Sequence, residues 1–451
     1  MKKSLTALAA LAAVGAASAQ SSVTLYGIVD IGYGAQKTST RNGSGNIKSS
    51  GVMDGSNGGP RIGFRGTEDL GGGLKANFVV EQGISPTNGS LFGVRSSGSG
   101  HQIAGLSAGA GATQLGGAGG AYTVSTNNQS YVGLSTATLG TVNIGYQYTV
   151  LYELALLSGY NVGSQSMPGA DKAHLHGLFG VGGNVRSNMI QYISPNYSGF
   201  TARLQYGAGA DREKVEAPGT LANTNGLTLD KLRKGGVMLQ YANGPISAGA
   251  AYTYAKSQSS AGIAGVTVAP VPLNVFGGVA GSAGSTPLTG IERKFRLFQL
   301  GGSYDFGVAK VSGTFNRGKN GGAAAAPAAT SPIGTEGFNS DYRAAQIGVA
   351  VPLGAFVPFA TYGRARTDSS NPLGTGPTAT AGATNRTEDY KQYQVGVRYS
   401  LSKRTTAYAF YGETKNDAAS LAGNGVSVAA GGTGGTFYKD RKGVVGVMHS
   451  F

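Results

Sequence analysis

The sequence predicts an all-β protein, a 16-stranded antiparallel transmembrane β-barrel, on three observations. First, runs of about ten residues alternate apolar and polar side chains, which is the period-two pattern of strands with one apolar face. Second, short turns alternate with long segments rich in Gly, Ser and Ala. Third, no stretch after residue 19 reaches the ~18 consecutive apolar residues that a spanning helix needs.

The first 19 residues form a predicted secretory signal peptide. Lys2 and Lys3 supply a positive start, residues 5–17 are apolar, and Ala17-Ser18-Ala19 is a small-residue cleavage site. No linker or change of composition divides the remainder, so residues 20–451 are expected to form one barrel domain.

Residues 61–81 carry the clearest strand pair. Arg61 and Arg65 share one parity of the first run, and Lys75, Asn77 and Glu81 share one parity of the second. A connection rich in Gly and Asp joins the two runs, as a hairpin requires. We expect the apolar parity to face lipid and the basic parity to line water.

The other strands follow from the same alternation. The chain opens with a strand over residues 22–36, followed by a polar loop over 37–60. After the hairpin, the remaining strands are expected at residues 128–136, 141–148, 186–194, 200–208, 235–242, 246–256, 294–305, 309–318, 342–351, 356–366, 389–401, 405–415 and 440–451.

This arrangement gives seven short turns and eight long loops, the topology of an outer-membrane barrel with turns in the periplasm and loops outside. Aromatic residues gather at both ends of the strands, as interfacial girdles do: Tyr192, Phe200, Tyr241, Tyr304, Tyr399 and Phe451 near the turns, and Tyr148, Tyr206, Tyr254 and Phe315 near the loops.

Pro358 falls inside a strand and lacks a backbone donor, so we expect a bulge there.

Composition narrows the alternatives. The chain has no cysteine, so disulfides and thiol chemistry are excluded. The 23 Tyr and 16 Phe argue against disorder despite 78 Gly. Alternation alone would also suit a soluble sandwich with its apolar faces packed together. The signal peptide and the strand count favour a closed barrel, which has no sheet edges to protect.

Four stretches resemble the general porins of β-proteobacteria: SSVTLYGIVDIGYG after the signal, the hairpin RIGFRGTEDLGGGLKANFVVEQG, YSLSKRTTAYAFYG, and the terminal GVMHSF. The resemblance implies a homotrimer in the outer membrane through which small hydrophilic solutes diffuse passively. It also implies that Phe451 is part of the C-terminal signal read by the barrel-assembly machinery.

In that family the third long loop folds into the barrel and narrows the pore. The corresponding segment here is 149–185, whose charged residues include Glu153, Asp171 and Lys172. The family usually carries more acids in this loop, so the resemblance implies a weaker transverse field. Gln191 stands where the family pattern often has a lumen-facing Arg.

The expected basic wall of the pore consists of Arg61, Arg65, Lys75, Arg203 and Arg398, with Asn77, Glu81 and Gln191 as further lining residues. Rings of basic side chains in a narrow pore favour anions. With a net charge of +15, we expect an anion-preferring or weakly selective general diffusion pore. The alternative is that many cations lie in solvated loops or bind lipopolysaccharide phosphates, as at Arg41, Lys48 and Lys256.

Other functions have weaker support. The histidines do not form a Ser–His–acid arrangement, so no enzyme is expected. His174 and His176 are too few ligands to indicate a metal, and no cofactor is expected. Gly71-Gly72-Gly73 lies in a hairpin turn and not before a helix, so neither a phosphate loop nor nucleic-acid binding is indicated. A substrate-specific channel for an anion, phosphate or sugar is the main alternative.

Overall fold

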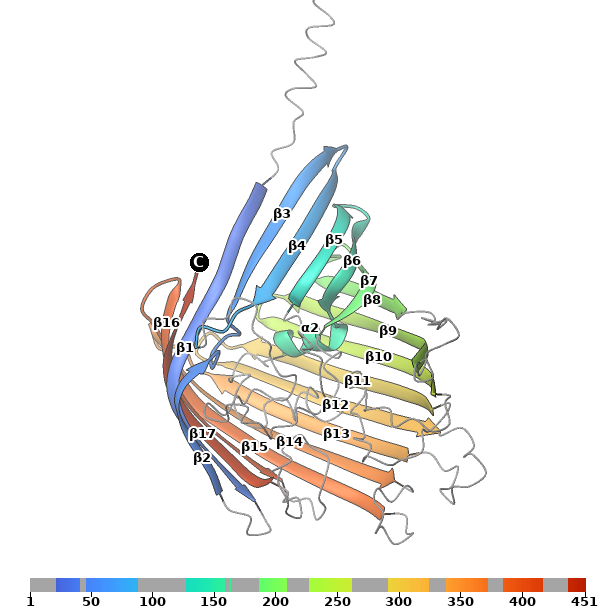
Figure 1. Ribbon diagram of the computed structural model, residues 1–451. Coiled ribbons are helices and arrows are strands. Elements are labelled where there is room, and N and C mark those ends of the chain that lie inside the picture. Colours follow the sequence, from blue (N-terminus) through green and yellow to red (C-terminus); the bar gives the residue numbers. More distant parts are fainter. Residues whose placement is uncertain are drawn as a thin grey trace, which may run out of the picture.

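The structure, a computed structural model, describes residues 22–40, 46–87, 127–158, 163, 186–208, 227–261, 291–323, 338–371, 384–416 and 437–451. Within these residues, seventeen strands form one antiparallel sheet that closes on itself, and one helix lies inside it (Figure 1). None of the helices in the described segments is long and apolar enough to cross a membrane.

The strands in chain order are β1 (Ser22–Thr40), β2 (Asn46–Asp54), β3 (Arg61–Gly71), β4 (Leu74–Gly83), β5 (Asn127–Thr136), β6 (Gly140–Tyr148), β7 (Arg186–Ile193), β8 (Phe200–Ala208), β9 (Leu227–Asn243), β10 (Ile246–Ala261), β11 (Ile291–Asp305), β12 (Lys310–Ala323), β13 (Phe338–Ala350), β14 (Phe356–Asn371), β15 (Thr384–Ser400), β16 (Thr405–Asn416) and β17 (Phe437–Ser450). The helix α2 (Val150–Leu157) follows β6.

The barrel has sixteen strand positions, because β2 and β3 share one of them. One end of β1 pairs with β3, from Ser22↔Thr67 to Ile28↔Arg61, and its other end pairs with β2, from Ile31↔Asp54 to Ser39↔Asn46. Along its opposite edge β1 pairs with β17. The wall is therefore closed, and the prediction of a 16-stranded antiparallel barrel is confirmed.

The two parities of each strand face opposite sides of the wall. On β1, Val23 and Leu25 are 64% and 51% exposed, whereas Asp30 on the other parity is fully buried. The same holds on β3 and β4, where Phe64 and Val80 form an exposed cross-strand pair. A sandwich would bury these apolar side chains between its sheets. Their exposure on the outside of a closed barrel fits contact with acyl chains.

At the ends that join the long loops, the observed strands are longer than the sequence predicted. Residues 37–60 were predicted as a polar loop, and that prediction is wrong: β1 continues to Thr40, and β2 occupies Asn46–Asp54. Strands β9 to β15 are likewise extended at their loop ends. Hydrogen bonding between strands continues above the hydrocarbon region, but the apolar alternation stops there because the outward side chains no longer meet lipid. Alternation therefore reports the membrane span and not the strand length.

The predicted bulge at Pro358 is also wrong, because β14 and β15 pair without a register shift from Phe356↔Tyr399 onward. No bulge is needed because the backbone nitrogen and carbonyl of one strand residue point to the same neighbouring strand. The Pro358 carbonyl accepts a hydrogen bond from the Val351 N–H at 3.0 Å, so this side faces β13, whose last residue is Ala350. The missing donor thus affects only the last rung of the ladder.

Aromatic pairs cover the turn end of the outer wall. The rings of Phe200 and Tyr241 lie 4.7 Å apart, and those of Phe356 and Tyr399 lie 4.4 Å apart, each pair joining adjacent strands. These rings mark the interface between hydrocarbon and headgroups on this side.

Candidate functional site: the barrel lumen

The helix α2 lies inside the barrel against the inner face of β9, β10 and β11 (Figure 1). Val150 and Leu154 are fully buried and pack into a cluster with Met238, Ala251 and Leu297 from these strands. This apolar patch on the inner wall is what keeps the short helix in place, since eight residues are too few to form a stable isolated helix.

Glycines on β9 and β10 make room for the helix. A Cβ at Gly236 would lie 2.8 Å from a Val150 methyl carbon, and one at Gly249 would lie 3.0 Å from Leu154 Cδ1. Both distances are shorter than ordinary carbon contacts, so larger residues would push α2 toward the centre of the lumen. The strand glycines therefore fix the depth at which the helix sits.

Hydrogen bonds hold the two ends of α2. At its start, the Val150 N–H donates to Gln205 Oε1 at 2.9 Å, and Gln205 Nε2 donates to the Tyr148 carbonyl at 2.9 Å. At its end, the Ser303 hydroxyl donates to the Leu157 carbonyl at 3.3 Å. These bonds satisfy backbone groups that a helix terminus leaves without intrahelical partners.

Glu153 on α2 carries the charge of this part of the lumen. Its Oε2 lies 2.8 Å from Arg203 Nη1 on β8 and accepts a longer hydrogen bond of 3.5 Å from Gln191 Nε2 on β7. Burial raises the pKa of Glu153 to about 7, although the Arg203 charge and the Gln191 hydrogen bond act in the opposite direction. The carboxyl therefore titrates near neutral pH.

A second ion pair lies on β3 and β4. Arg61 Nε is 3.2 Å from Glu81 Oε2, and the Tyr26 hydroxyl donates to the same oxygen at 3.0 Å. The Arg65 guanidinium lies over the Tyr26 ring, 5.2 Å from its centroid. Asn77 Nδ2 donates to Asn143 Oδ1 at 3.1 Å. This wall thus presents Arg61 with its charge compensated and Arg65 resting on an aromatic face.

Arg398 on β15 joins three parts of the interior. Its Nε donates to Asn57 Oδ1 at 2.7 Å, and its Nη2 donates to the Gly163 carbonyl at 3.2 Å. Its guanidinium also lies 4.5 Å from the centroid of the Phe359 ring. Gly163 follows α2 in the chain, and this hydrogen bond places it beside β15.

Asp30 anchors the connection between β2 and β3. The N–H groups of Asn57 and Gly58 donate to Asp30 Oδ2 at 2.7 and 2.6 Å, and the Tyr408 hydroxyl donates to Oδ1 at 2.7 Å. Asn57 is in turn the acceptor for Arg398. The Asp30–Asn57–Arg398 chain of hydrogen bonds thus positions the guanidinium that holds Gly163.

The proposed lining residues can now be placed. Arg61, Arg65, Lys75, Asn77, Glu81, Gln191, Arg203 and Arg398 all lie on the inward parity. Glu153 lies on α2, whereas Asp171, Lys172 and the histidines His101, His174 and His176 are outside the described residues. The described part contains no group of three or more His, Asp or Glu side chains that could hold a metal ion.

Sequence reasoning missed Asp30, Asn57, Gln205 and Tyr26. Asp30 had a detectable signal, because it is the only charged residue between positions 22 and 36 and has Val29 and Ile31 on either side, but its partners are remote in sequence. At the other end of the chain, Phe451 exchanges two 3.1 Å backbone hydrogen bonds with Gly27 and so completes the seam between the first and last strands.

Residues 4–419 match the family model described as Gram-negative porin. The chain belongs to this family. It is 28% identical over 441 residues to an outer membrane porin protein of Bordetella pertussis, with 91% of this chain and 93% of the relative covered. It is also 30% identical over 325 residues to outer membrane porin protein 32 of Delftia acidovorans, covering 71% and 70%.

Among solved structures, the fold is similar to that of an anion-selective porin from Comamonas acidovorans, with a TM-score of 0.57, 23% identity, and 96% and 100% of the two chains covered. The relatives are porins, which are channels and not enzymes. The chain is therefore an outer-membrane porin, and the resemblance to β-proteobacterial porins is confirmed.

Proposed function

We propose that this porin is a general diffusion channel with a weak preference for anions, narrowed by α2 and the segment after it. The observation that carries the proposal is the partial pairing of the inner wall. Glu81 compensates Arg61 and Glu153 compensates Arg203, while Arg65 and Lys75 add positive charge on the same inward parity. A pore in which only part of the basic wall is compensated by carboxylates should favour anions, but weakly.

The test is the reversal potential of the purified protein in planar bilayers under a salt gradient. A modest anion preference at neutral pH is the expected result, and a clear cation preference would contradict the proposal. Saturable block by one sugar or phosphate compound would instead favour a substrate-specific channel. The similar fold of the anion-selective porin from Comamonas acidovorans supports the expected sign.

We further infer a homotrimer that associates through the short strands β4 to β8. The outward side chains of these strands include the exposed apolar Val132, Leu134 and Ile144. An uncharged exposed patch suits contact between copies. Conductance steps in multiples of three, together with the mass of the detergent-solubilised particle, would test this assembly.

The remaining partners follow from the place of the chain in the outer membrane. We propose that residues 1–19, which lie outside the described residues, are removed on export, and that Phe451 contributes to recognition by the barrel-assembly machinery. Outer-membrane lipids, including lipopolysaccharide, surround the exposed apolar wall, and small hydrophilic solutes pass through the lumen. Nucleic acid is not proposed as a partner. The mass of the mature protein tests the cleavage.

A further inference from the structure

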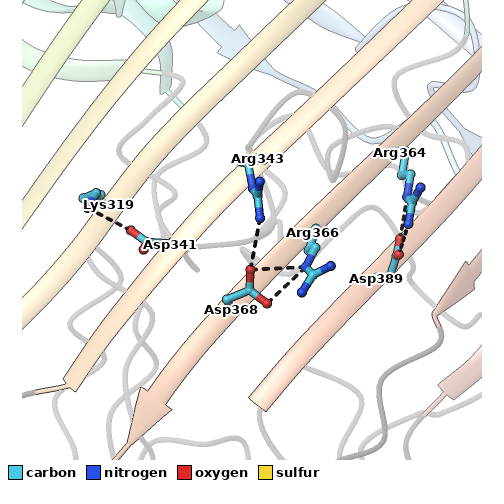
Figure 2. A network of polar contacts seen from close by, with 7 residues as sticks. All are labelled: Lys319, Asp341, Arg343, Arg364, Arg366, Asp368 and Asp389. Atoms are coloured by element: carbon cyan, nitrogen blue, oxygen red, sulfur yellow. Dashed lines mark hydrogen bonds and ion pairs between the residues drawn. The ribbon is translucent and has the colours of Figure 1, made fainter. Parts of the chain in front are cut away.

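Ion pairs lie on both faces of the barrel wall, and only those on the inner face meet a permeating ion. On the outward parity, Lys319 lies 3.5 Å from Asp341 (Figure 2). Arg364 likewise pairs with Asp389 across β14 and β15 (Figure 2). In these outer pairs each cation has one carboxylate beside it in the register. On the inner face, one carboxylate has two arginines within reach.

The inner carboxylate is that of Glu81. It lies opposite Gly63 in the ladder between β3 and β4. Arg61 and Arg65 stand two residues to either side of Gly63 and share its inward parity. Both arginines are therefore diagonal neighbours of Glu81, at a separation that long side chains can span. Register alone would allow either of them to pair with it.

Only one of the two arginines forms the pair. Arg61 Nε lies 3.2 Å from Glu81 Oε2, whereas the Arg65 guanidinium lies over the Tyr26 ring, 5.2 Å from its centroid. The other oxygen of the carboxylate, Glu81 Oε1, is buried without a hydrogen-bond partner among the described residues. A buried acceptor without a partner is costly, and a second guanidinium would relieve that cost. Charge alone thus does not explain why Arg65 stays away.

The Tyr26 ring lies between the two arginines. Tyr26 stands directly opposite Gly63 on the β1 side, so Tyr26, Gly63 and Glu81 form one row across β1, β3 and β4. A Cβ at Gly63 would lie 2.6 Å from Tyr26 Cζ, so the ring crosses β3 over this glycine. The Tyr26 hydroxyl then reaches Glu81 Oε2 and donates to it at 3.0 Å. The gap that the glycine leaves between the arginines is filled by the ring.

We propose that Tyr26 is a positioning residue for the anion preference of the pore, because its ring is a spacer that keeps Arg65 away from Glu81. With the ring in place, Glu81 holds one arginine and Arg65 presents its charge to the lumen. Without the ring, Arg65 would close on Glu81 Oε1, and one carboxylate would hold two cations against the wall. The inference rests on the proposed anion preference and names a residue that sets its size.

A purely structural role for Tyr26 makes different predictions from the spacer role. A ring that only fills space over Gly63 would affect the hairpin whether or not Glu81 is charged. A spacer matters only while a carboxylate is present to draw Arg65 to the wall. The ring should also matter more than the hydroxyl, since the ring is the part that Arg65 contacts. These differences can be measured as a coupling between two substitutions.

The experiment is a double-mutant cycle on the purified full-length protein. The readout is the anion-to-cation permeability ratio, obtained from reversal potentials in planar bilayers at low salt. The variants are Y26A, E81Q and Y26A/E81Q, and Y26F is the conservative change that keeps the ring. Y33A is the matched control for the tyrosine, because Tyr33 lies on the outward parity of the same strand and is 59% exposed. D389N is the control for E81Q, since it removes a carboxylate from an outer arginine pair.

The spacer predicts a definite pattern of ratios. Y26A should lower the ratio by up to about twofold, and E81Q should raise it about two- to fourfold, as expected for one charge near the ion path. Y26A/E81Q should equal E81Q, because no carboxylate remains to withdraw Arg65. Y26F, Y33A and D389N should each stay close to the wild type. Folding is checked by heat-dependent gel mobility. Y26L replaces Y26A if the alanine variant does not fold, since leucine offers no ring face to a guanidinium.

Several results would overturn the spacer role. An equal change on removing Tyr26 with and without Glu81 would show a purely structural role. A ratio in Y26F as low as that in Y26A would assign the effect to the hydroxyl. An unchanged ratio in Y26A would show that the ring does not hold Arg65 away. A wild type without anion preference would instead refute the proposed function, and the cycle would still show whether Tyr26 and Glu81 are coupled.

Discussion

Glutamine in place of Glu153 is the sharpest test of how the lumen controls ion passage. Glu153 is the acid on α2 that pairs with Arg203 at 2.8 Å, and its pKa of about 7 makes its charge depend on pH near neutrality. In the wild type, acidification from pH 8.5 to 5.5 should protonate this carboxyl and remove one negative charge from the lumen. Anion preference should therefore rise as pH falls, and E153Q should hold the high preference at every pH.

The size of the effect follows from Coulomb's law. One charge acting on an ion about 8 Å away in water contributes roughly 0.5 kcal/mol, which changes the local concentration of anions and of cations about twofold in opposite directions. Screening at 0.1 M salt, where the Debye length is about 10 Å, roughly halves this energy. The anion-to-cation permeability ratio should thus change about two- to fourfold, and the change should vanish at about 1 M salt.

Reversal potentials at 0.1 M mean salt, measured from pH 5.5 to 8.5, provide the assay. The matched control is E68Q, which removes a carboxylate from the outward parity of β3 and leaves the lumen unchanged. A wild-type ratio independent of pH, or an E153Q variant that retains the full pH dependence, would refute the reasoning.

Three further changes test the interior and the seam. L154A removes most of a fully buried side chain and should weaken the packing of α2 against the wall by about 3 kcal/mol. We expect noisier single-channel current. A current as quiet as that of the wild type would contradict this prediction. R398Q removes the charged hydrogen bond to the Gly163 carbonyl, worth about 2 kcal/mol, and should add brief conductance fluctuations. The R398K variant should reduce these fluctuations only in part. Deleting Phe451 removes both bonds to Gly27 and should lower the folded fraction in the outer membrane, measured by heat-dependent gel mobility; an unchanged fraction would show that the seam does not need them.

The fold could be predicted because alternation, turn residues and terminal motifs are local in the sequence. The turn ends of strands such as β8 and β10 were placed correctly, since Gly, Asn and Pro stop a strand there for steric reasons. The strands were predicted too short at the long-loop ends, because outward residues beyond the membrane no longer alternate. Thr40 and the whole of β2 are the clearest examples.

The lumen was only partly predictable. Parity is enough to assign Arg61 or Gln191 to the inner face, because it needs no knowledge of neighbours. The contacts that define the site join residues far apart in the chain, such as Arg398 with Asn57 and Tyr408 with Asp30, and alternation carries no information about them. For many other cations, the strand register in the structure was needed to tell whether the side chain faces the lumen or the outer surface.

The division of charge between the two faces of the wall has a consequence for how the porin can diversify. On the described strands β9 to β17, β1 and β2, the outward parity carries more basic than acidic side chains near the long-loop ends, and this surplus meets headgroups and never a permeating ion. The net charge of a related porin thus reflects the membrane surface around it more than the solutes that pass through it. The charge of the outer surface and the selectivity of the lumen can change independently in evolution.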